Sequence, residues 1–276
     1  MFKLIKIGIT GSSGILGTHL IGFLKKNSKY RIHTFKHNVL NIKKINNWIK
    51  KNQFQIIIHL AALVPIKKAK QNYKLAKQIN FIGTKNLINA LKKHQKKKLY
   101  IFFSSSSHVY SFNKQKINEK FEKKGISQYG NTKILAENLL LKNKNFFYLC
   151  IGRISSLTSE KQSTNFLLKK IVEIGKKNQN FDFGNSNIRR DFIYVEDVAK
   201  IIVKIIKKKI TGTINISNSE TTHLYSLLNY LNKNYGFNIK HFLGKEETLV
   251  LSNKLLLQKI GKYKFLKVKE ILKKIF

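Results

Sequence analysis

The sequence predicts an α/β fold: a doubly wound parallel sheet of the Rossmann type, with a second, small and discontinuous α/β domain. Three observations support this prediction. Short apolar, β-branched segments alternate with longer amphipathic ones through the first half of the chain, which is typical of βαβ units. Three closely spaced glycines follow the first apolar segment and lead into a helical pattern. The alternation becomes irregular after Ser155, which indicates a second kind of architecture.

The elements of the first part follow from the two periodicities. Runs rich in Ile, Leu, Phe and Tyr are short enough for strands that are covered on both faces of a parallel sheet. The segments between them carry apolar residues at helical spacing. The predicted strands are residues 4–9, 31–35, 55–60, 99–104 and 146–151, and the predicted helices are residues 14–26, 42–51, 69–93 and 129–141.

The second part contains fewer strands and several helices. Helical patterns cover residues 166–177, 224–234 and 267–275, and a short strand is predicted at residues 213–216. Asp197 is expected to cap the helix that continues as Val198, Ala199 and Lys200. We expect the Rossmann-type domain at residues 1–152 and 188–216, and the small domain at residues 153–187 and 217–276.

The formal net charge of +41 suggests a protein that binds polyanions. However, only four of the 54 basic residues are arginines, the residue type that phosphate recognition favours. The lysines are spread over the whole chain together with Asn, Ile, Phe and Tyr, which share A/T-rich codons. We therefore interpret the lysines as solvated surface and do not expect nucleic-acid binding, although a polyanion-binding role stays an alternative.

The cysteine content and the apolar runs bear on the location of the protein. Cys150 is the only cysteine, which excludes an internal disulfide and a cysteine-based metal site. No apolar run approaches the roughly 20 residues of a membrane span. The first apolar run is too short, and too interrupted by Lys6, for a signal peptide. We expect a cytoplasmic protein that has no membrane contact and no bound metal.

The glycine-rich stretch at residues 10–17 has the features of a phosphate-binding turn. Gly11 would allow a tight turn, Gly14 a close approach of the backbone to a pyrophosphate, and Gly17 close packing of the helix on the sheet. The free N–H groups at the helix N-terminus would then meet the phosphates. The alternative is a tight βα turn that binds nothing.

The end of the second predicted strand bears on which dinucleotide would bind. An acidic residue there pairs with the ribose hydroxyl of NAD, whereas a basic residue accommodates the 2′-phosphate of NADP. Residues 31–38 contain no acid, and Lys36 and His37 stand where the strand should end. We favour NADP, and NAD stays open because lysine is frequent throughout this chain.

Tyr129 and Lys133 form a Tyr-x-x-x-Lys pattern on a predicted helix, where residues four apart share a face. The phenol would serve as an acid or base if a nearby ammonium lowered its pKa from about 10. A run of serines from Ser104 to Ser107 ends the strand upstream. A hydroxyl at that edge of the sheet can hydrogen bond a substrate oxygen that is being oxidised or reduced.

These motifs together resemble those of the extended short-chain dehydrogenase/reductase family, which contains the NAD(P)-dependent nucleotide-sugar epimerases, dehydratases and reductases. The resemblance extends over essentially the whole chain, and the order and spacing of the motifs are more specific than any one of them. The stretches that carry it are TGSSGILG at 10–17, IIIHLAA at 56–62, NFIGTKNLINAL at 80–91, FFSSSSHVY at 102–110, YGNTKILAE at 129–137, RDFIYVEDVA at 190–199 and TINIS at 213–217.

The resemblance implies a role for each matching position. Tyr129 would be the acid/base, Lys133 would lower its pKa and hold the nicotinamide ribose, and Ser106 would be the catalytic hydroxyl. Arg190 would bind the substrate diphosphate, with Ser107 as a further substrate contact; a surface pair of Arg190 with Asp191 is the alternative. The cofactor contacts implied are Gly11, Ser13, Gly14, Ile15, Leu16, Gly17, Lys36, Asn41, Ile42, Leu60, Ala61, Ala62 and Lys133, with Asn80 bracing the site.

Several positions depart from the family pattern. Asn41 stands where the family usually has an Asp beside the adenine, and the usual Gly-Pro loop is missing after Arg153. Ser107 and His108 replace the Asp-Glu pair of the dehydratases. Family members that abstract a ring C–H proton carry a Glu or Cys where this chain has His108. Histidine has a pKa near 6.5, so we hypothesise a second acid/base here; a histidine that only hydrogen bonds near the pocket is the alternative.

The function implied is hydride transfer between a sugar carbon of a nucleoside-diphosphate sugar and NADP or NAD, in an enzyme that is an epimerase or a reductase. An NADPH-consuming 4-keto-sugar reductase is the first alternative. A cofactor-binding regulator that contacts polyanions through its lysine-rich faces is an alternative of another class. Family members often dimerise through helix pairs beside the active site, so a homodimer is also implied.

Overall fold

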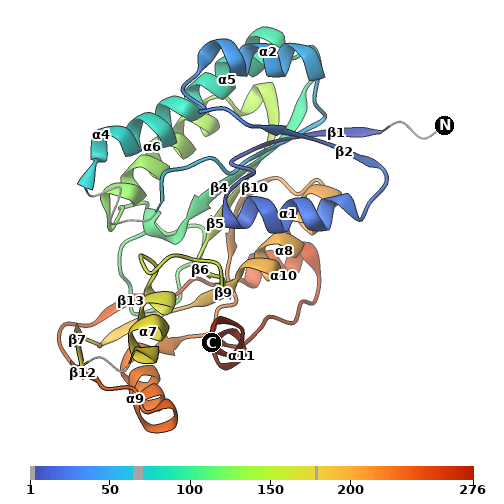
Figure 1. Cartoon of the computed structure of the whole chain (residues 1–276). Coiled ribbons are helices and arrows are strands. Elements are labelled where there is room, and N and C mark those ends of the chain that lie inside the picture. Colours follow the sequence, from blue (N-terminus) through green and yellow to red (C-terminus); the bar gives the residue numbers. More distant parts are fainter. Residues whose placement is uncertain (1–3, 65–70, 178–179) are drawn as a thin grey trace.

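The computed structural model describes residues 4–64, 71–177 and 180–276 of the chain. Its central feature is a six-stranded sheet with the strand order β10-β5-β4-β3-β1-β2 (Figure 1). All five neighbouring pairs are parallel, which confirms the predicted doubly wound fold. The strands are β1 (Ile5–Thr10), β2 (Tyr30–Phe35), β3 (Ile56–His59), β4 (Leu99–Ser106), β5 (Phe147–Ile154) and β10 (Gly212–Ile216).

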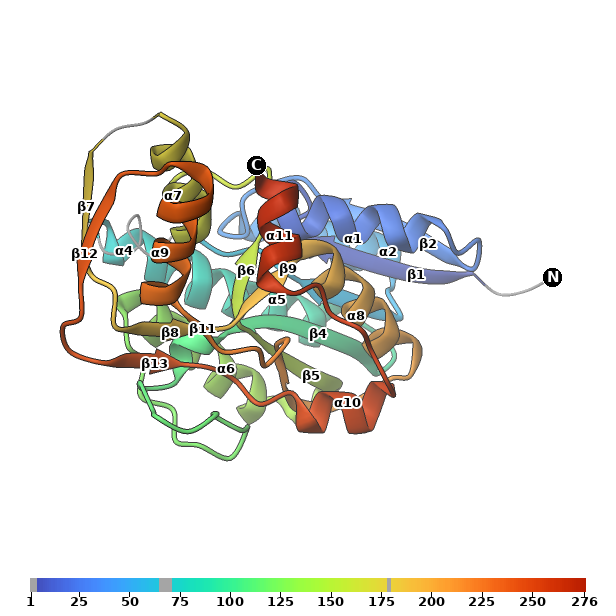
Figure 2. The ribbon, with the colours of Figure 1, turned by 90° about the horizontal axis from the view of Figure 1, so that it is seen from below.

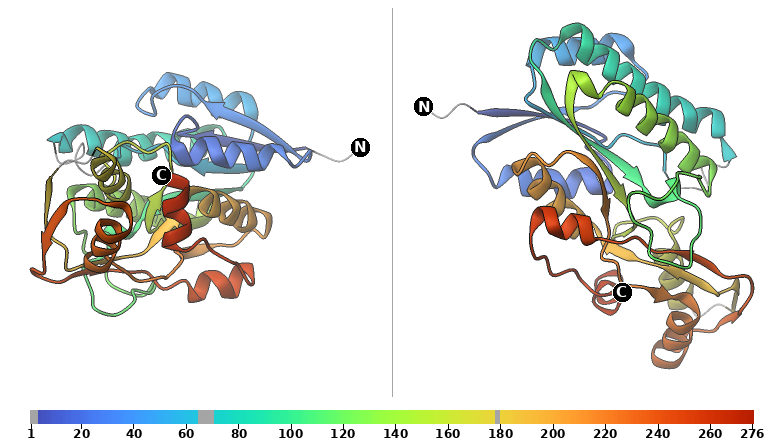
Figure 3. Two further views of the ribbon diagram at one scale, coloured as in Figure 1. Left: turned by 60° about the horizontal axis from the view of Figure 1, so that its bottom comes forward. Right: turned by 180° about the vertical axis from the view of Figure 1, so that it is seen from behind.

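Helices cover both faces of this sheet, as the buried and continuously apolar strands require (Figure 1). One face packs on α2 (Ile42–Asn52), α5 (Gly83–His94) and α6 (Gln128–Lys142), and the core there contains Ile45, Leu87 and Leu140. The other face packs on α1 (Ile15–Lys25), α8 (Val195–Lys207) and α10 (Lys254–Ile260). Viewed from behind, the same two layers enclose the sheet (Figure 3).

A second group of elements lies beyond the carboxyl ends of the parallel strands (Figures 1 and 2). It has its own apolar core, in which Val172, Leu228 and Leu272 are buried. Its helices are α7 (Leu167–Lys176), α9 (Leu224–Tyr235) and α11 (Val268–Ile275). It contains a three-stranded sheet of β11 (Thr222–His223), β8 (Ile188–Arg190) and β13 (Glu247–Leu249). Two further pairs of strands are β12 (Ile239–Phe242) with β7 (Phe181–Asn185), and β6 (Ser156–Thr158) with β9 (Phe192–Tyr194).

The order of the large sheet determines where a ligand can approach. From β1 the chain runs outward to β2 and then returns to β3 on the other side of β1. In open α/β sheets the crevice at such a reversal, outside the carboxyl ends of the strands, is where ligands bind. Gly11 directly follows β1 and Leu60 directly follows β3, so both lie at this reversal. No helix among the described residues is long and apolar enough to cross a membrane.

The helix predicted over residues 69–93 begins outside the described residues, and from Tyr73 to His94 the helical conformation is confirmed. The sequence did not predict its irregular middle part. The short α4 (Tyr73–Lys77) passes into a π-helical turn, η1 (Gln78–Ile82), before α5 begins. Asp197 does not cap a helix, because α8 already starts at Val195. Its carboxylate instead accepts hydrogen bonds from the Tyr263 hydroxyl and the Leu266 amide. The predicted division into two domains stays a prediction.

Candidate active site

A cleft of about 1080 Å³ opens at the carboxyl ends of β1, β3 and β4 and extends to α7 and Phe192. The structure therefore brings together residues that are up to 181 positions apart in the chain, from Gly11 to Phe192. Most of the predicted site residues line it: Gly11, Ser13, Gly14, Ile15, Leu16, Gly17, Lys36, Leu60, Ala61, Ala62, Ser106, Ser107, His108, Tyr129, Lys133 and Arg190.

The glycine turn leaves no room for larger residues. Gly11 has a φ of 70°, and a Cβ there would lie 2.5 Å from the Ala61 nitrogen. A Cβ on Gly17 would lie 2.4 Å from the Gly11 carbonyl oxygen. Because these contacts are with backbone atoms, side-chain movement cannot relieve them. The two glycines are thus required by the close approach of the turn to α1 and to the end of β3.

The turn fits the pyrophosphate of a dinucleotide. Gly14 is the N-cap of α1, and no side chain caps this helix. The first N–H groups of a helix have no partner within the helix, so here they are available to an anion. No acidic residue lies in the first turn of α1 to repel one. Leu60, Ala61 and Ala62 line the cleft beside the turn.

The residues predicted to contact the adenosine divide into two groups. Lys36, at the end of β2, lines the cleft together with His37. Asn41 and Ile42 are not among the cleft-lining residues of the described chain. The side chain of Asn41 caps α2 by accepting the Lys44 amide, and Ile42 is 57% exposed. Their predicted contact with the cofactor stays a prediction.

Asn80 lies in the π-helical turn η1 and is fully buried. Its side-chain oxygen accepts the Leu63 amide at 2.6 Å, and its side-chain nitrogen donates to the Thr132 hydroxyl at 2.9 Å. The extra residue of a π turn changes the direction of the side chains that follow, and such turns are frequent at functional sites. Asn80 thus holds α6 against the segment after β3, beneath the cleft and not in its wall.

Tyr129 and Lys133 stand one turn apart on α6. The Ser127 hydroxyl caps this helix by accepting the Gly130 amide. A Cβ on Gly130 would lie 2.0 Å from the carbonyl oxygen of His108, so glycine allows α6 to lie directly against the end of β4. This contact places Tyr129 beside Ser106 at the floor of the cleft.

Burial controls the charges of this pair. It raises the pKa of Tyr129 above its ordinary value of 10, and the hydrogen-bonding Ser106 hydroxyl opposes that effect. Burial lowers the pKa of Lys133 to about 7, and the Glu137 carboxylate opposes that shift. The ammonium nitrogen of Lys133 lies 4.5 Å from the centre of the Phe103 ring. The predicted lowering of the Tyr129 pKa by Lys133 stays a prediction.

His108 follows the serines at the end of β4 and faces Tyr129, with 6.2 Å between the ring centres. Its Nδ1 lies 3.1 Å from the Ser127 hydroxyl. Burial lowers its pKa to about 4, and the positive charge of Arg190 contributes. The imidazole is therefore neutral near pH 7, with a basicity below that of a free histidine.

Arg190 lines the cleft, and its guanidinium donates to the carbonyl oxygens of Arg189 and Glu247 and to the Glu247 carboxylate. The alternative of a surface pair with Asp191 is wrong. Asp191 is completely buried and accepts a hydrogen bond from Ser217. Successive side chains of an extended segment point in opposite directions, so these two neighbours cannot share one face.

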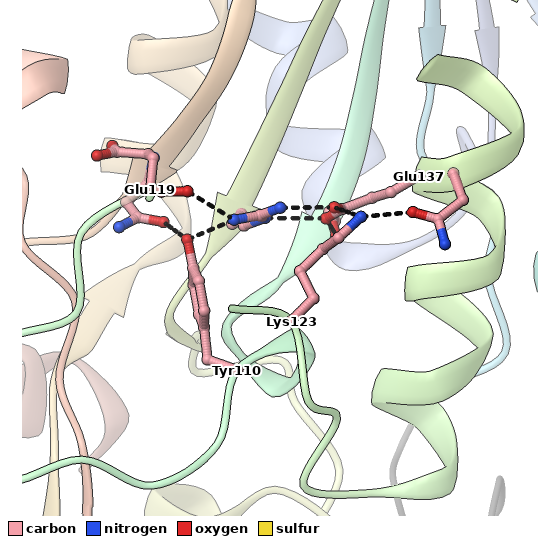
Figure 4. A network of polar contacts seen from close by, with 8 residues as sticks. Tyr110, Glu119, Lys123 and Glu137 are labelled. Carbon is pink, nitrogen blue, oxygen red and sulfur yellow. Dashed lines mark hydrogen bonds and ion pairs between the residues drawn. The ribbon is translucent and has the colours of Figure 1, made fainter. Parts of the chain in front are cut away.

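A charged network behind α6 was missed by the sequence analysis (Figure 4). The guanidinium of Arg153 donates twice to the Glu137 carboxylate, at 3.1 and 2.7 Å, and once to the Tyr110 hydroxyl. Ser105 donates to the same carboxylate at 2.5 Å. One signal was available: Glu137 continues the Tyr129–Lys133 spacing by another four residues, in a chain with only 13 acidic residues.

Comparison with known proteins adds the following similarities. The model of the NAD dependent epimerase/dehydratase family matches residues 7–217. The chain is 28% identical to the GDP-6-deoxy-D-talose 4-dehydrogenase of Aggregatibacter actinomycetemcomitans, over 82% of this chain and 79% of that one. It is 25% identical to a putative UDP-glucose 4-epimerase of Methanocaldococcus jannaschii, over 83% and 82%.

Solved structures share the fold. RMD of Pseudomonas aeruginosa, complexed with NADPH, superposes with a TM-score of 0.87 at 20% identity, over 98% of this chain and 97% of that one. The UDP-glucose 4-epimerase of Thermotoga maritima, with UDP-glucose, superposes with a TM-score of 0.85 at 19% identity, over 98% and 96%.

Proposed function

Because this chain belongs to the NAD dependent epimerase/dehydratase family, we propose that it transfers a hydride between a sugar carbon of a nucleoside-diphosphate sugar and NADP or NAD. One observation carries the proposal. Ser106, Tyr129 and Lys133 line the same cleft as the glycine turn at Gly11 and Gly14. An acid/base group and a dinucleotide-binding turn in one cleft are what this reaction requires.

In this proposal, side chains of the protein transfer the proton of the sugar hydroxyl. Tyr129 takes the proton of the sugar hydroxyl when the carbon is oxidised and returns it on reduction. Ser106 hydrogen bonds the same oxygen as it changes between hydroxyl and carbonyl. Lys133 in its protonated form favours the phenolate of Tyr129. The nicotinamide, when bound, supplies the acceptor and the donor of the hydride. Arg190 binds the substrate diphosphate, for which a guanidinium at the cleft wall is suited.

Removal of the Tyr129 hydroxyl tests this proposal. Tyr129→Phe should lower kcat about 10²- to 10⁴-fold, the usual contribution of a positioned acid/base, while cofactor binding is retained. Tyr100→Phe is the matched control, since it removes a buried hydroxyl that bonds the carbonyl of Ile210, away from the cleft. If Tyr129→Phe loses neither turnover nor any other activity, the protein is a cofactor-binding regulator and not an enzyme of this mechanism.

Two reactions share these residues. An epimerase returns the hydride to the other face of the sugar, whereas a 4-keto-sugar reductase consumes NADPH. Lys36 at the cleft wall favours NADPH and hence the reductase. Mass spectrometry of the cofactor released from denatured, freshly purified protein separates them. Tightly held NAD would support the epimerase and contradict the role of Lys36, and preferential binding of added NADPH would support the reductase.

His108 is proposed as a second acid/base that exchanges a ring C–H proton beside a keto group. Its place opposite Tyr129, with 6.2 Å between the ring centres, supports this role. His108→Asn should abolish incorporation of solvent deuterium into the sugar and leave hydride transfer measurable. Full turnover together with full deuterium incorporation in this variant would mean that His108 only hydrogen bonds near the pocket.

A further inference from the structure

His59 is a buried titratable side chain that the proposed mechanism does not use. It ends β3 directly beneath the cleft and is almost completely inaccessible to solvent. Its Nδ1 lies 2.6 Å from the Thr10 hydroxyl, and its Nε2 lies 2.9 Å from the Thr84 hydroxyl. Thr10 immediately precedes Gly11 of the turn, and Thr84 lies in the first turn of α5.

The hydrogen bonds of Thr84 and Thr10 determine which ring nitrogen of His59 carries the proton. Thr84 donates its hydroxyl proton to the carbonyl oxygen of Asn80 at 2.7 Å. Thr84 must therefore accept from Nε2–H of His59, because a hydroxyl has only one proton. A neutral imidazole that carries its proton on Nε2 accepts at Nδ1, so Thr10 donates there. Thr10 in turn accepts the Ala61 amide at 3.4 Å.

The chain of hydrogen bonds continues to the catalytic helix. The Asn80 side chain donates to the Thr132 hydroxyl at 2.9 Å, and Thr132 donates to the carbonyl oxygen of Tyr129 at 2.7 Å. Every hydroxyl and ring nitrogen from Thr10 to Thr132 is buried, and every bond donates in the same direction. Within each of two parts, from Thr10 to the Asn80 carbonyl and from the Asn80 side chain to the Tyr129 carbonyl, the bonds polarise one another. The two parts are joined through the covalent framework of Asn80, which transmits a displacement but not the polarisation.

The nearby Lys133 ammonium is a second reason for the His59 imidazole to stay neutral. Burial lowers the pKa of His59 to about 3, and the nearby Lys133 ammonium contributes. The His59 and Phe103 rings lie 5.6 Å apart, and Lys133 lies over that same Phe103 ring. A protonated His59 would repel Lys133 and would no longer accept from Thr10. The hydrogen bonds thus link the residue before the dinucleotide turn to the backbone of Tyr129, and Lys133 acts on His59 through its charge.

We propose that His59 and Thr84 are positioning residues that couple occupancy of the glycine turn to the placement of Tyr129. The proposal rests on the proposed function, because it requires a dinucleotide in the turn. Movement of the Gly11 backbone onto a pyrophosphate would be transmitted from Thr10 through His59 and Thr84 to Asn80, and then to α6. Neither residue lines the cleft, so neither contacts the ligand in this proposal.

The test uses ADP as the probe, because ADP carries a pyrophosphate but no nicotinamide that could reach Tyr129 directly. Amide hydrogen exchange is measured with and without saturating ADP. In the native protein, ADP should slow exchange both at residues 11–17 and at residues 128–133. In Thr84→Val, protection at residues 11–17 should stay, while protection at residues 128–133 should fall by about 2- to 30-fold, the range of such couplings. Tyr100→Phe, which also loses a buried hydroxyl, should behave as the native protein.

Two substitutions of His59 keep the test decisive if Thr84→Val fails to fold. His59→Asn retains an acceptor near Nδ1 for Thr10, and His59→Gln retains a donor near Nε2 for Thr84. Both interrupt the series and should remove the ADP-dependent protection of residues 128–133. Protection there that persists in all folded variants, or that is absent from the native protein while residues 11–17 are protected, overturns the coupling. Absence of any ADP protection at residues 11–17 overturns the proposed function, and the coupling with it.

Discussion

Two buried polar networks hold the catalytic helix α6, and they differ in charge. Behind the helix, Glu137 and Arg153 form an ion pair at 2.7 Å that Ser105 and Tyr110 complete (Figure 4). Beneath the cleft, the series from His59 to Thr132 is neutral throughout. Both networks are almost entirely inaccessible to solvent.

The difference in charge implies a difference in use. Two opposite charges in the interior are tolerable only in each other's presence, so the ion pair permits one arrangement of α6 on β4 and β5. Neutral hydrogen bonds contribute about 0.5–1.5 kcal/mol each and can lengthen or shift at small cost. The charged network is therefore suited to fix the helix on the sheet, and the neutral network to adjust its first turns.

Removal of one partner of the ion pair should give the largest effect. Glu137→Gln leaves the Arg153 guanidinium buried without a counter-charge, which should lower the free energy of unfolding by about 3–5 kcal/mol. Urea denaturation measures this loss. The double variant Glu137→Gln/Arg153→Met removes both charges and should be more stable than Glu137→Gln alone. A single variant that loses less than about 1 kcal/mol would show that the pair is not desolvated as the structure indicates.

Removal of a hydrogen bond from the neutral network should lower the free energy of unfolding less than Glu137→Gln does, and should lower kcat more. Thr132→Val leaves the Asn80 amide and the Tyr129 carbonyl short of a partner, which should lower the free energy of unfolding by about 1–3 kcal/mol. Because the lost bonds hold the backbone of Tyr129, kcat should fall more than KM changes. Equal turnover per folded molecule in Thr132→Val and the native protein would make this network a structural one only.

The stability that the neutral network contributes should depend on pH through His59. The folded-state pKa of His59 is about 3, against 6.5 in the unfolded chain, so the unfolded state takes up a proton first as the pH falls. The stability that His59 contributes is complete above pH 6.5 and is lost progressively towards pH 3, by at most about 1.4 kcal/mol per pH unit.

His59→Gln tests whether the stability contributed by His59 decreases as the pH falls. The free energy of unfolding is measured between pH 7 and pH 4. The variant should lose stability less steeply than the native protein over this range. His108, with a lowered pKa, and Asp191, whose pKa burial raises to about 6, titrate in the same range in both proteins and cancel in the difference. Identical slopes would mean that His59 has the same pKa in the folded and unfolded states, so that its burial does not lower the pKa.

The features of the fold and the site that the sequence predicts are those that depend on residues close together in the chain. The parallel sheet, the turn at Gly11 and the pair Tyr129–Lys133 depend on local spacing, which one sequence displays directly. The interruption of the helix at Asn80 is a single extra residue, and an apolar period does not reveal that.

Contacts between distant segments could not be predicted in this way. Glu137 and Arg153 are 16 residues apart on different elements, and only the packing of α6 on β5 brings them together. The misassignment of Asp197 has the same cause, because the residues it bonds return from 66 and 69 positions further along the chain. Polar partners of this kind depend on tertiary structure, so one sequence shows a polar residue without its partner.

Lys123 offers the smallest effect and separates burial from charge within the charged network. It lies 3.6 Å from the Glu137 carboxylate, but its side chain is 23% exposed, whereas Glu137 is fully buried. An ion pair that water reaches contributes about 0–1 kcal/mol and is screened by salt. Lys123→Met should therefore change the free energy of unfolding by less than about 1 kcal/mol, and the change should shrink further in 1 M salt. The loss in Glu137→Gln should instead be nearly independent of salt, because ions cannot enter between Glu137 and Arg153. A loss in Lys123→Met as large as that in Glu137→Gln would mean that total charge, and not the buried pair with Arg153, stabilises α6.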